Sequence, residues 1–289
     1  MLFELGVLAA FGAMVCWGFG DFFIQKSTRQ SGDVESLAFI GIIGSVMLLP
    51  FVLLDLHLLF SVENLLFLSF IGIVTLFVAL LDFEALKEGK LSVIEIVFEV
   101  ELPITVILGL VFFAETLSTQ QAALVLLILA GIGLLSLGAI SKQHYFKRFE
   151  KGVMLAVIGA IGMAFLNFLT AAGSRQVSPA MAVWVPYLVF TIICLFLIWR
   201  REGFPKLVKN AKTYKLVILG MGVFDTLAWL LFAFAVLEEE LAVTIAIIEC
   251  YPAVGLVLGV LINREKVRKH QVAGAAIALA ACISLGLLL

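Results

Sequence analysis

The sequence predicts an all-α membrane protein of ten transmembrane helices, arranged as two inverted five-helix repeats. Hydrophobic residues make up 63% of the 289 positions, charged residues only 14%, and the mean hydropathy is +1.18. This composition is too apolar for a soluble domain. We expect no cleaved signal peptide, because the first apolar run is long enough to span a bilayer and lacks a basic leader. No P-loop, nucleophile elbow or HExxH motif is present, so we expect no enzymatic activity.

Ten apolar segments of roughly membrane-spanning length follow one another along the chain. They cover residues 3–25, 34–56, 62–86, 91–114, 119–140, 152–173, 180–199, 215–236, 241–262 and 270–289. The polar stretch 141–151 divides them into two groups of five. We therefore expect a first repeat over residues 1–140, a linker over 141–151 and a second repeat over 152–289.

The two groups of segments look like copies of one another. At an offset of 150 residues, Glu99, Glu115 and Gln121 fall on Glu249, Glu265 and Gln271, and at an offset of 146, Asp21 falls on Asn167. Because five crossings is an odd number, the second copy must enter the membrane upside down. Inverted repeats of this kind are typical of secondary carriers, whose binding sites lie near the midplane between the repeats.

Segment 91–114 carries three carboxylates, Glu95, Glu99 and Glu101, ahead of Pro103. An acid in the middle of a span costs about 2.5 to 3.5 kcal/mol, so such groups normally face a protein interior or a wet cavity. Glu95 and Glu99 share one helical face, whereas Glu101 points nearly the opposite way. Pro103 removes one backbone donor and is expected to kink the helix beside the acids.

Glu249 in segment 241–262 and Asp225 in segment 215–236 add further acids at mid-span, whereas no Lys or Arg lies in the middle of any span. A cavity lined in this way has a negative potential and suits a cation, an ammonium group or protons. Aromatic rings nearby can hold a cation over their faces. The predicted substrate or proton site comprises Glu99, Glu249, Asp225, Glu95, Trp17, Trp229 and Tyr251, with Glu101, Asp21, Asn167 and Tyr187 as secondary candidates.

Purely structural roles are also open to these residues. A buried carboxyl can simply be kept protonated, and rings also fill cores and interfacial belts. Asp82 and Glu84 stand close to Lys87 and are interpreted as solvated. The four cysteines show no ligand spacing and are interpreted as core residues, and no histidine lies mid-span, so we expect no soft-metal site.

The positive charges indicate an orientation. Eighteen of the nineteen Lys and Arg residues fall in loops on one side of the predicted membrane, against Arg175 alone on the other. The positive-inside rule places the richer side in the cytoplasm, so both termini are expected outside, in a multi-pass protein of the cell membrane.

Two related stretches carry a family resemblance: AETLSTQQAALVLLILAGIGLL from Ala114 and REKVRKHQVAGAAIALAACISLG from Arg264. With the ten-segment, two-repeat pattern, they resemble the EamA domains of the drug/metabolite transporter superfamily over nearly the whole chain. The resemblance implies that helices 1, 3, 4, 6, 8 and 9 surround a central cavity and that helices 5 and 10 lie at the periphery. Ten-helix members usually keep both termini inside, contrary to the charge bias.

Together these observations predict a secondary transporter that moves a small cationic or amine-bearing metabolite by alternating access, with protons as the coupling ion and no other cofactor. The alternatives are a proton-linked amino-acid or drug exporter, a carrier of Mg-like divalent metals held by carboxylate oxygens, and a non-transporting scaffold or receptor. The expected partners are the small-molecule substrate and the lipid bilayer but no nucleic acid, and the protein is expected to be a monomer or a homodimer.

Overall fold

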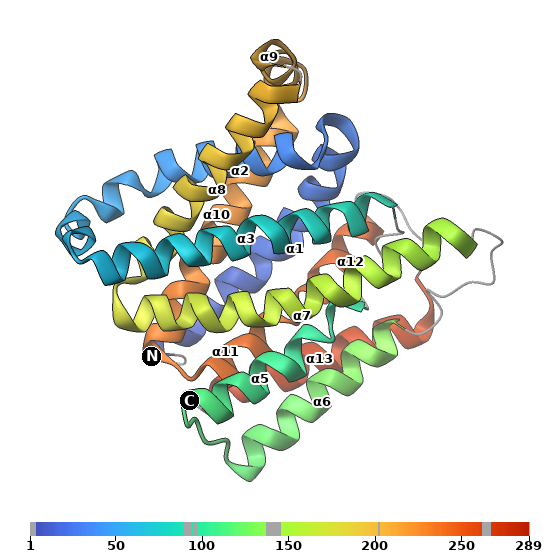
Figure 1. Ribbon diagram of the computed structural model, residues 1–289. Helices are drawn as coiled ribbons and strands as arrows, with labels where there is room; N and C mark the ends of the chain where they lie inside the picture. Colours follow the sequence, from blue (N-terminus) through green and yellow to red (C-terminus); the bar gives the residue numbers. More distant parts are fainter. Residues whose placement is uncertain are drawn as a thin grey trace.

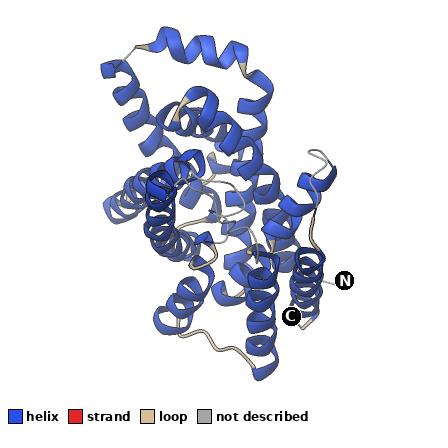
Figure 2. Cartoon of the chain, turned by 90° about the vertical axis from the view of Figure 1, so that its right-hand side faces the viewer, coloured by secondary structure: helices blue, strands red, loops and turns tan. Residues whose placement is uncertain are grey.

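The computed structural model describes residues 4–88, 94, 97–136, 146–201, 203–261 and 267–288. Within these ranges the chain is helical and contains no β-strand (Figure 2). Seven helices are long and apolar enough to cross a membrane, and three further apolar helices, Glu101–Phe112, Thr119–Leu135 and Leu241–Val257, are shorter. The chain is therefore a multi-pass membrane protein, and the count of ten crossings stays a prediction.

The helices of the first half are α1 (Leu5–Ser31), α2 (Asp33–Val52), the short 3-10 helix η1 (Leu56–Phe60), α3 (Val62–Glu88), α5 (Glu101–Phe112) and α6 (Thr119–Ser136). Those of the second half are α7 (Phe146–Gln176), α8 (Pro179–Arg201), α9 (Phe204–Thr213), α10 (Lys215–Glu238), α11 (Leu241–Ile248), α12 (Tyr251–Leu261) and α13 (Lys269–Leu287). The short α9 links α8 to α10 at the place in the repeat where η1 links α2 to α3.

The two halves interleave rather than forming separate bundles. Helix α1 packs along α10, α3 along α7, α2 along α8 and α6 along α13 (Figure 1). Glycines permit the closest of these crossings: a Cβ atom built on Gly274 of α13 would lie 2.5 Å from the backbone oxygen of Gly131 on α6. Every one of these four contacts joins the first half of the chain to the second.

The predicted span 91–114 is interrupted. Residues 99–100 form a turn, and α5 starts afresh at Glu101. The second half repeats this interruption, since α11 ends at Ile248, residues 249–250 form a turn, and α12 starts at Tyr251. Pro103 and Pro252 fall in the first turns of α5 and α12, where the missing N–H costs no helical hydrogen bond.

Hydrogen bonds of glutamine side chains start α6 and α13 in similar ways. The backbone N–H of Ser118 donates to Oε1 of Gln121 at 2.8 Å, and the N–H of Gln121 donates to Oγ of Ser118 at 3.2 Å. At α13 the N–H of Arg268 donates to Oε1 of Gln271 at 3.0 Å. Each glutamine thus satisfies a backbone donor that the helix itself leaves unpaired.

Different ion pairs lie at the two ends of the helix bundle. At one end Lys87 lies 2.9 Å from Asp33 and Lys206 lies 3.7 Å from Glu35, so the ends of α3 and α9 meet the start of α2 there. At the other end lie Arg175 and the two chain termini marked in Figure 1. The sequence-based orientation of these two ends relative to the cell stays a prediction.

Candidate functional site

A cavity of about 110 Å³ lies between the two halves. It is lined by Trp17, Asp21, Ile24, Leu37, Ile40, Thr75, Ala79, Asp82, Phe83, Leu86, Phe98, Glu101, Met163, Leu166, Asn167, Tyr187, Phe190, Asp225, Trp229, Ile245, Glu249 and Tyr251. The described residues of α6 and α13 contribute nothing to this lining, which agrees with the expected peripheral position of helices 5 and 10. Helices α2 and α8 also line it, which the family resemblance does not imply.

Five of the lining side chains are carboxyls, contributed by α1, α3, α5, α10 and the turn before α12. They are Asp21, Asp82, Glu101, Asp225 and Glu249, and the lining formed by the described residues contains no Lys, Arg or His. The most buried of them, Glu249, is only 4% exposed. Coulombic repulsion links these five groups to one another. A positive charge placed among them would relieve that repulsion, whereas an anion would add to it.

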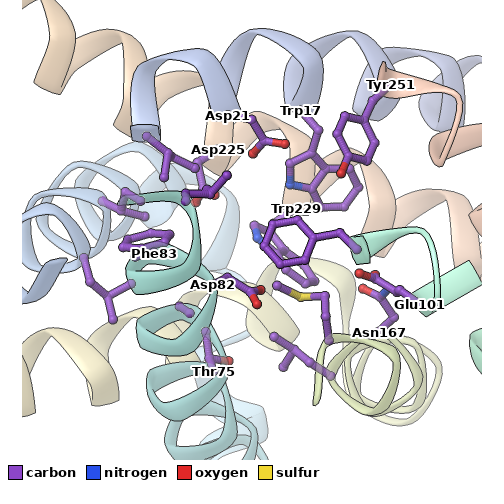
Figure 3. Close-up of a pocket in the computed structure, with 18 of the residues that line it drawn as sticks. Trp17, Asp21, Thr75, Asp82, Phe83, Glu101, Asn167, Asp225, Trp229 and Tyr251 are labelled. Carbon is purple, nitrogen blue, oxygen red and sulfur yellow. The ribbon is translucent and has the colours of Figure 1, made fainter. Parts of the chain in front are cut away.

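Two of the acids are held by neutral donors. The hydroxyl of Tyr187 on α8 donates to Oδ2 of Asp225 on α10 at 2.5 Å. The side-chain Nδ2 of Asn167 on α7 donates to Oε1 of Glu101 on α5, and these two side chains point toward each other in Figure 3. Neither donor carries a charge, so both pairs fix the position of a carboxyl without supplying a positive charge beside it.

Asp82 is held differently. Its Oδ1 atom is buried with no hydrogen-bond partner among the described residues. The same oxygen occupies the space that a Cβ atom on Gly159 of α7 would need, so a larger residue at position 159 would displace the Asp82 carboxyl. A buried carboxylate oxygen without a partner is costly in an empty protein. Burial of this oxygen becomes favourable when a cation or a proton binds to it.

Aromatic rings occupy the middle of the cavity, with Asp21 and Asp225 on one side and Glu101 on the other (Figure 3). Trp17 and Trp229 meet edge to face with their ring centroids 5.2 Å apart. The ring centroid of Tyr187 lies 5.0 Å from that of Phe190. Ring faces beside carboxyls provide the two features that bind organic cations, a π surface and a negative charge.

Most of the residues predicted for the site line this cavity. Glu249, Asp225, Trp17, Trp229, Tyr251, Glu101, Asp21, Asn167 and Tyr187 all do so. Glu99 does not: it is buried, 9% exposed, and lies outside the lining. The turn at residues 99–100 explains the difference, because it brings Glu101 to the cavity in place of Glu99. Glu95 lies outside the described residues.

The interpretation of Asp82 as a solvated residue is wrong, since it is 6% exposed and lines the cavity. Its position on α3 could have indicated this. Thr75, Ala79, Asp82 and Leu86 fall on one helical face, and all four line the cavity. Thr75 stands 150 residues before Asp225, at the equivalent position of the first repeat. The face of α3 that carries Thr75 is therefore expected to line the cavity.

The end of the bundle that holds the termini is closed by an ionic network around Arg175, in the last turn of α7. Arg175 Nη2 lies 2.8 Å from Oε1 of Glu115, its Nε donates to the carbonyl of Val236 at 2.8 Å, and its Cζ lies 4.3 Å from the centroid of the Phe113 ring. The Glu115 carboxylate also accepts the N–H groups of Leu241 and Ala242 at 2.8 and 2.9 Å. Glu115 thus caps α11 and binds three separate segments together.

The opposite end has a looser version of the same contact. Arg29 stands 146 residues before Arg175, and its Nη2 donates to the carbonyl of Leu86 at 3.4 Å; Leu86 stands 150 residues before Val236. The cavity reaches toward this end, since Ile24, Leu37 and Leu86 belong to its lining. The two ends are therefore related by the repeat, and the cavity reaches toward the end that holds Arg29.

The interleaved inverted helices around a shared cavity define a membrane transport protein made of two related halves. The family model of the EamA-like transporter family matches residues 4–137 and 150–287, so the chain belongs to this family. A solved structure titled "Crystal structure of protein" aligns with a TM-score of 0.74 over 96% of this chain and 96% of its own, at 14% identity, which shows a common fold. The comparison with curated proteins found no match.

Proposed function

We propose that this membrane transporter carries a small cationic or amine-bearing metabolite by alternating access, coupled to protons. The observation that carries the proposal is the cavity itself, in which five carboxyls meet with no Lys, Arg or His among the described lining residues. A phosphorylated or carboxylate substrate would need basic partners of the kind that Arg and Lys supply. The lining instead offers carboxylates and the faces of Trp17 and Trp229.

The size of the cavity limits the substrate. An engineered apolar cavity of about 150 Å³ accepts benzene, so a space of about 110 Å³ suits an amine of only a few heavy atoms unless the site widens on binding. The partnerless Oδ1 of Asp82 and the tyrosine-held carboxylate of Asp225 are the natural contacts for its ammonium group.

Protons are the proposed coupling ion because they compete for the same oxygens. A buried carboxyl can hold a proton when no substrate is present and release it when an ammonium group arrives. Glu101 and Glu249 both line the cavity, so a proton and a cationic substrate can compete for the same carboxyls. Exchange of one cation for a proton then needs no separate ion site.

The different contacts at the two ends of the bundle support the proposal of alternating access. The Arg175–Glu115 network closes one end, while the lining reaches toward the other. Opening the first end requires that Arg175 release Glu115. New contacts at the opposite end can offset the free energy that this separation costs. The inverted repeat supplies the matching element there, Arg29 beside Leu86.

Divalent metals are a weaker candidate. Among the described residues no group of three or more His, Cys, Asp or Glu side chains could hold a metal ion. Mg²⁺ and Ca²⁺ require six or more converging oxygens at about 2.0 to 2.6 Å, including those of bound waters. The carboxyls of this cavity are instead spread around a pair of indole rings.

Uptake into proteoliposomes tests the proposal. We would first find ligands by thermal shift with small amines, amino acids and divalent cations, since a ligand of the native state stabilises it. We expect a primary amine to drive proton movement in the opposite direction, and Asp225→Asn to abolish both fluxes. Glu63→Gln, at an exposed acid outside the cavity, is the matched control and should transport normally. An anionic substrate, or full activity in Asp225→Asn, would refute the proposal.

A further inference from the structure

Helix α9 is a short cationic helix that links α8 to α10. It spans ten residues with the sequence FPKLVKNAKT, and Gly203 before it adopts a φ of +70°, which turns the chain out of α8. Figure 1 shows α9 beyond the ends of α8 and α10, viewed nearly along its axis, and Figure 2 shows it from the side at the top of the molecule. It therefore lies across the end of the bundle and does not continue either span.

Its faces are sharply divided. Leu207 and Asn210 are buried against the protein. Phe204 and Val208 form an apolar edge beside them that stays 44% and 51% exposed. The side chains of Lys206, Lys209 and Lys212 are exposed and occupy an arc of about 120° on the remaining surface, at about 100° per residue. This order of apolar edge and cationic arc is typical of helices that lie in a membrane interface.

Cations continue beyond both ends of α9. Arg200 and Arg201 precede it and Lys215 follows it, all exposed. From residue 200 to residue 215 the sequence holds six Lys or Arg residues against one acid, Glu202. Glu35 lies 3.7 Å from Lys206, which is too long and too exposed a pair to cancel the positive field of the helix.

The position of α9 along the membrane normal is fixed by its neighbours. Both α8 and α10 are long apolar spans, and α9 joins their ends. On α8, Phe196 and Trp199 expose 55% and 59% of their surfaces just before the arginines. Exposed Trp beside Arg marks the boundary between hydrocarbon and headgroups. The cations of α9 therefore follow directly along the chain from this aromatic and basic end of α8.

We propose that α9 is a binding surface for anionic phospholipids. Lys206, Lys209 and Lys212 contact the headgroup phosphodiesters, while Phe204 and Val208 enter the boundary of the acyl chains. Near an anionic membrane each such lysine strengthens binding about fivefold. This inference does not depend on the substrate proposed for the central cavity, which shares none of these residues.

Native mass spectrometry of the full-length protein in detergent tests the proposal, with phosphatidylglycerol and phosphatidylcholine as competing lipids. The variant K206Q/K209Q/K212Q should bind phosphatidylglycerol at least about tenfold more weakly, with phosphatidylcholine unaffected. The control K26Q/R268Q/K269Q removes three exposed cations elsewhere and should bind like the wild type. The variant K209Q/K212Q keeps the contact of Lys206 with Glu35 and decides the question if the triple variant does not fold.

Three results would overturn the proposal. The first is unchanged phosphatidylglycerol binding in both α9 variants. The second is an equal loss in the control, which would mean that total charge and not α9 attracts the lipid. The third is displacement of the lipid by millimolar inorganic phosphate, which would make the surface a site for a free anion.

Discussion

The two interrupted helices of this transporter occupy equivalent places in their repeats, yet they deliver acids to the cavity at different positions. In the second half the acid at the break, Glu249, lines the cavity itself. In the first half the acid at the break, Glu99, is buried outside the lining, and Glu101, two residues later, takes the place beside the cavity. Glu101 accepts a hydrogen bond there from the opposite half of the chain, donated by Asn167.

This difference shows that the two repeats share a break in the helix but place the cavity carboxyl at different positions relative to that break. Both breaks are followed by a proline within the first helical turn, and a new helix starts at each of them. The proline stands four residues after Glu99 but only three after Glu249. One residue rotates a helix by about 100°, which is enough to move a side chain from the cavity to the packed interior.

Among the residues that differ between the two repeats, the largest expected effect comes from the acid at the second break. Glu249→Gln should reduce uptake into proteoliposomes roughly a hundredfold or more, because it removes one of the buried carboxyls that make the cavity favourable for a cation. Glu99→Gln should keep most of the wild-type rate. Equal loss in both variants, with both proteins folded, would mean that the breaks are functionally symmetric and would contradict the comparison.

The second prediction concerns the two arginines that the repeat relates. Arg175→Gln should lower the free energy of unfolding by about 3 kcal/mol, because it leaves the buried Glu115 carboxylate without its counter-charge. Arg29→Gln should cost less than about 1 kcal/mol, since Arg29 is exposed. Unfolding in mixed detergent micelles measures both values, and similar losses would show that the two ends are equally closed.

The third prediction tests the partner of Glu101. Asn167→Ala removes the hydrogen bond to this acid, and loss of such a partner costs about 1 to 3 kcal/mol. We expect the KM for the transported amine to rise roughly tenfold with the maximal rate nearly unchanged, because Glu101 remains present but is no longer fixed. A fall in the maximal rate at constant KM would instead place Asn167 in the conformational change.

The smallest effects belong to the helix caps, where the repeats are most alike. Gln121→Ala and Gln271→Ala should each lower stability by about 1 kcal/mol, because each glutamine accepts one backbone N–H at a helix start. Transport at moderate temperature should be unaffected. A large difference between the two losses, measured in the same detergent, would show that even the peripheral helices are unequal.

The apolar segments, the repeat and most of the cavity residues were predictable from the sequence, because burial of a carboxyl in a span needs an unusual reason wherever it occurs. Glu249 and Asp225 followed from that rule, and the two tryptophans followed from the helices they share with acids. The rule could not decide between Glu99 and Glu101. That choice depends on the residue at which the helix breaks. A proline indicates that a break lies nearby but does not give the exact residue.

The prediction for Asp82 failed for a related reason. Four residues separate it from Lys87, and this short distance from a polar loop says nothing about the helical face on which Asp82 lies. Its carboxyl is buried because α7 approaches α3 closely at Gly159, a contact between residues far apart in the chain. Gly159→Ala would fill the space that the Asp82 oxygen occupies. The sequence pattern of α3 does not show this contact, because Gly159 lies on another helix.

The interleaved packing has a consequence for how the protein is made. Helices α1 and α3 leave the ribosome long before α10 and α7, the helices against which they pack. The first half is therefore made before the helices that cover polar groups such as Asp21 and Asp82. Assembly of this transporter is bound to be a late event, completed only when the second half arrives.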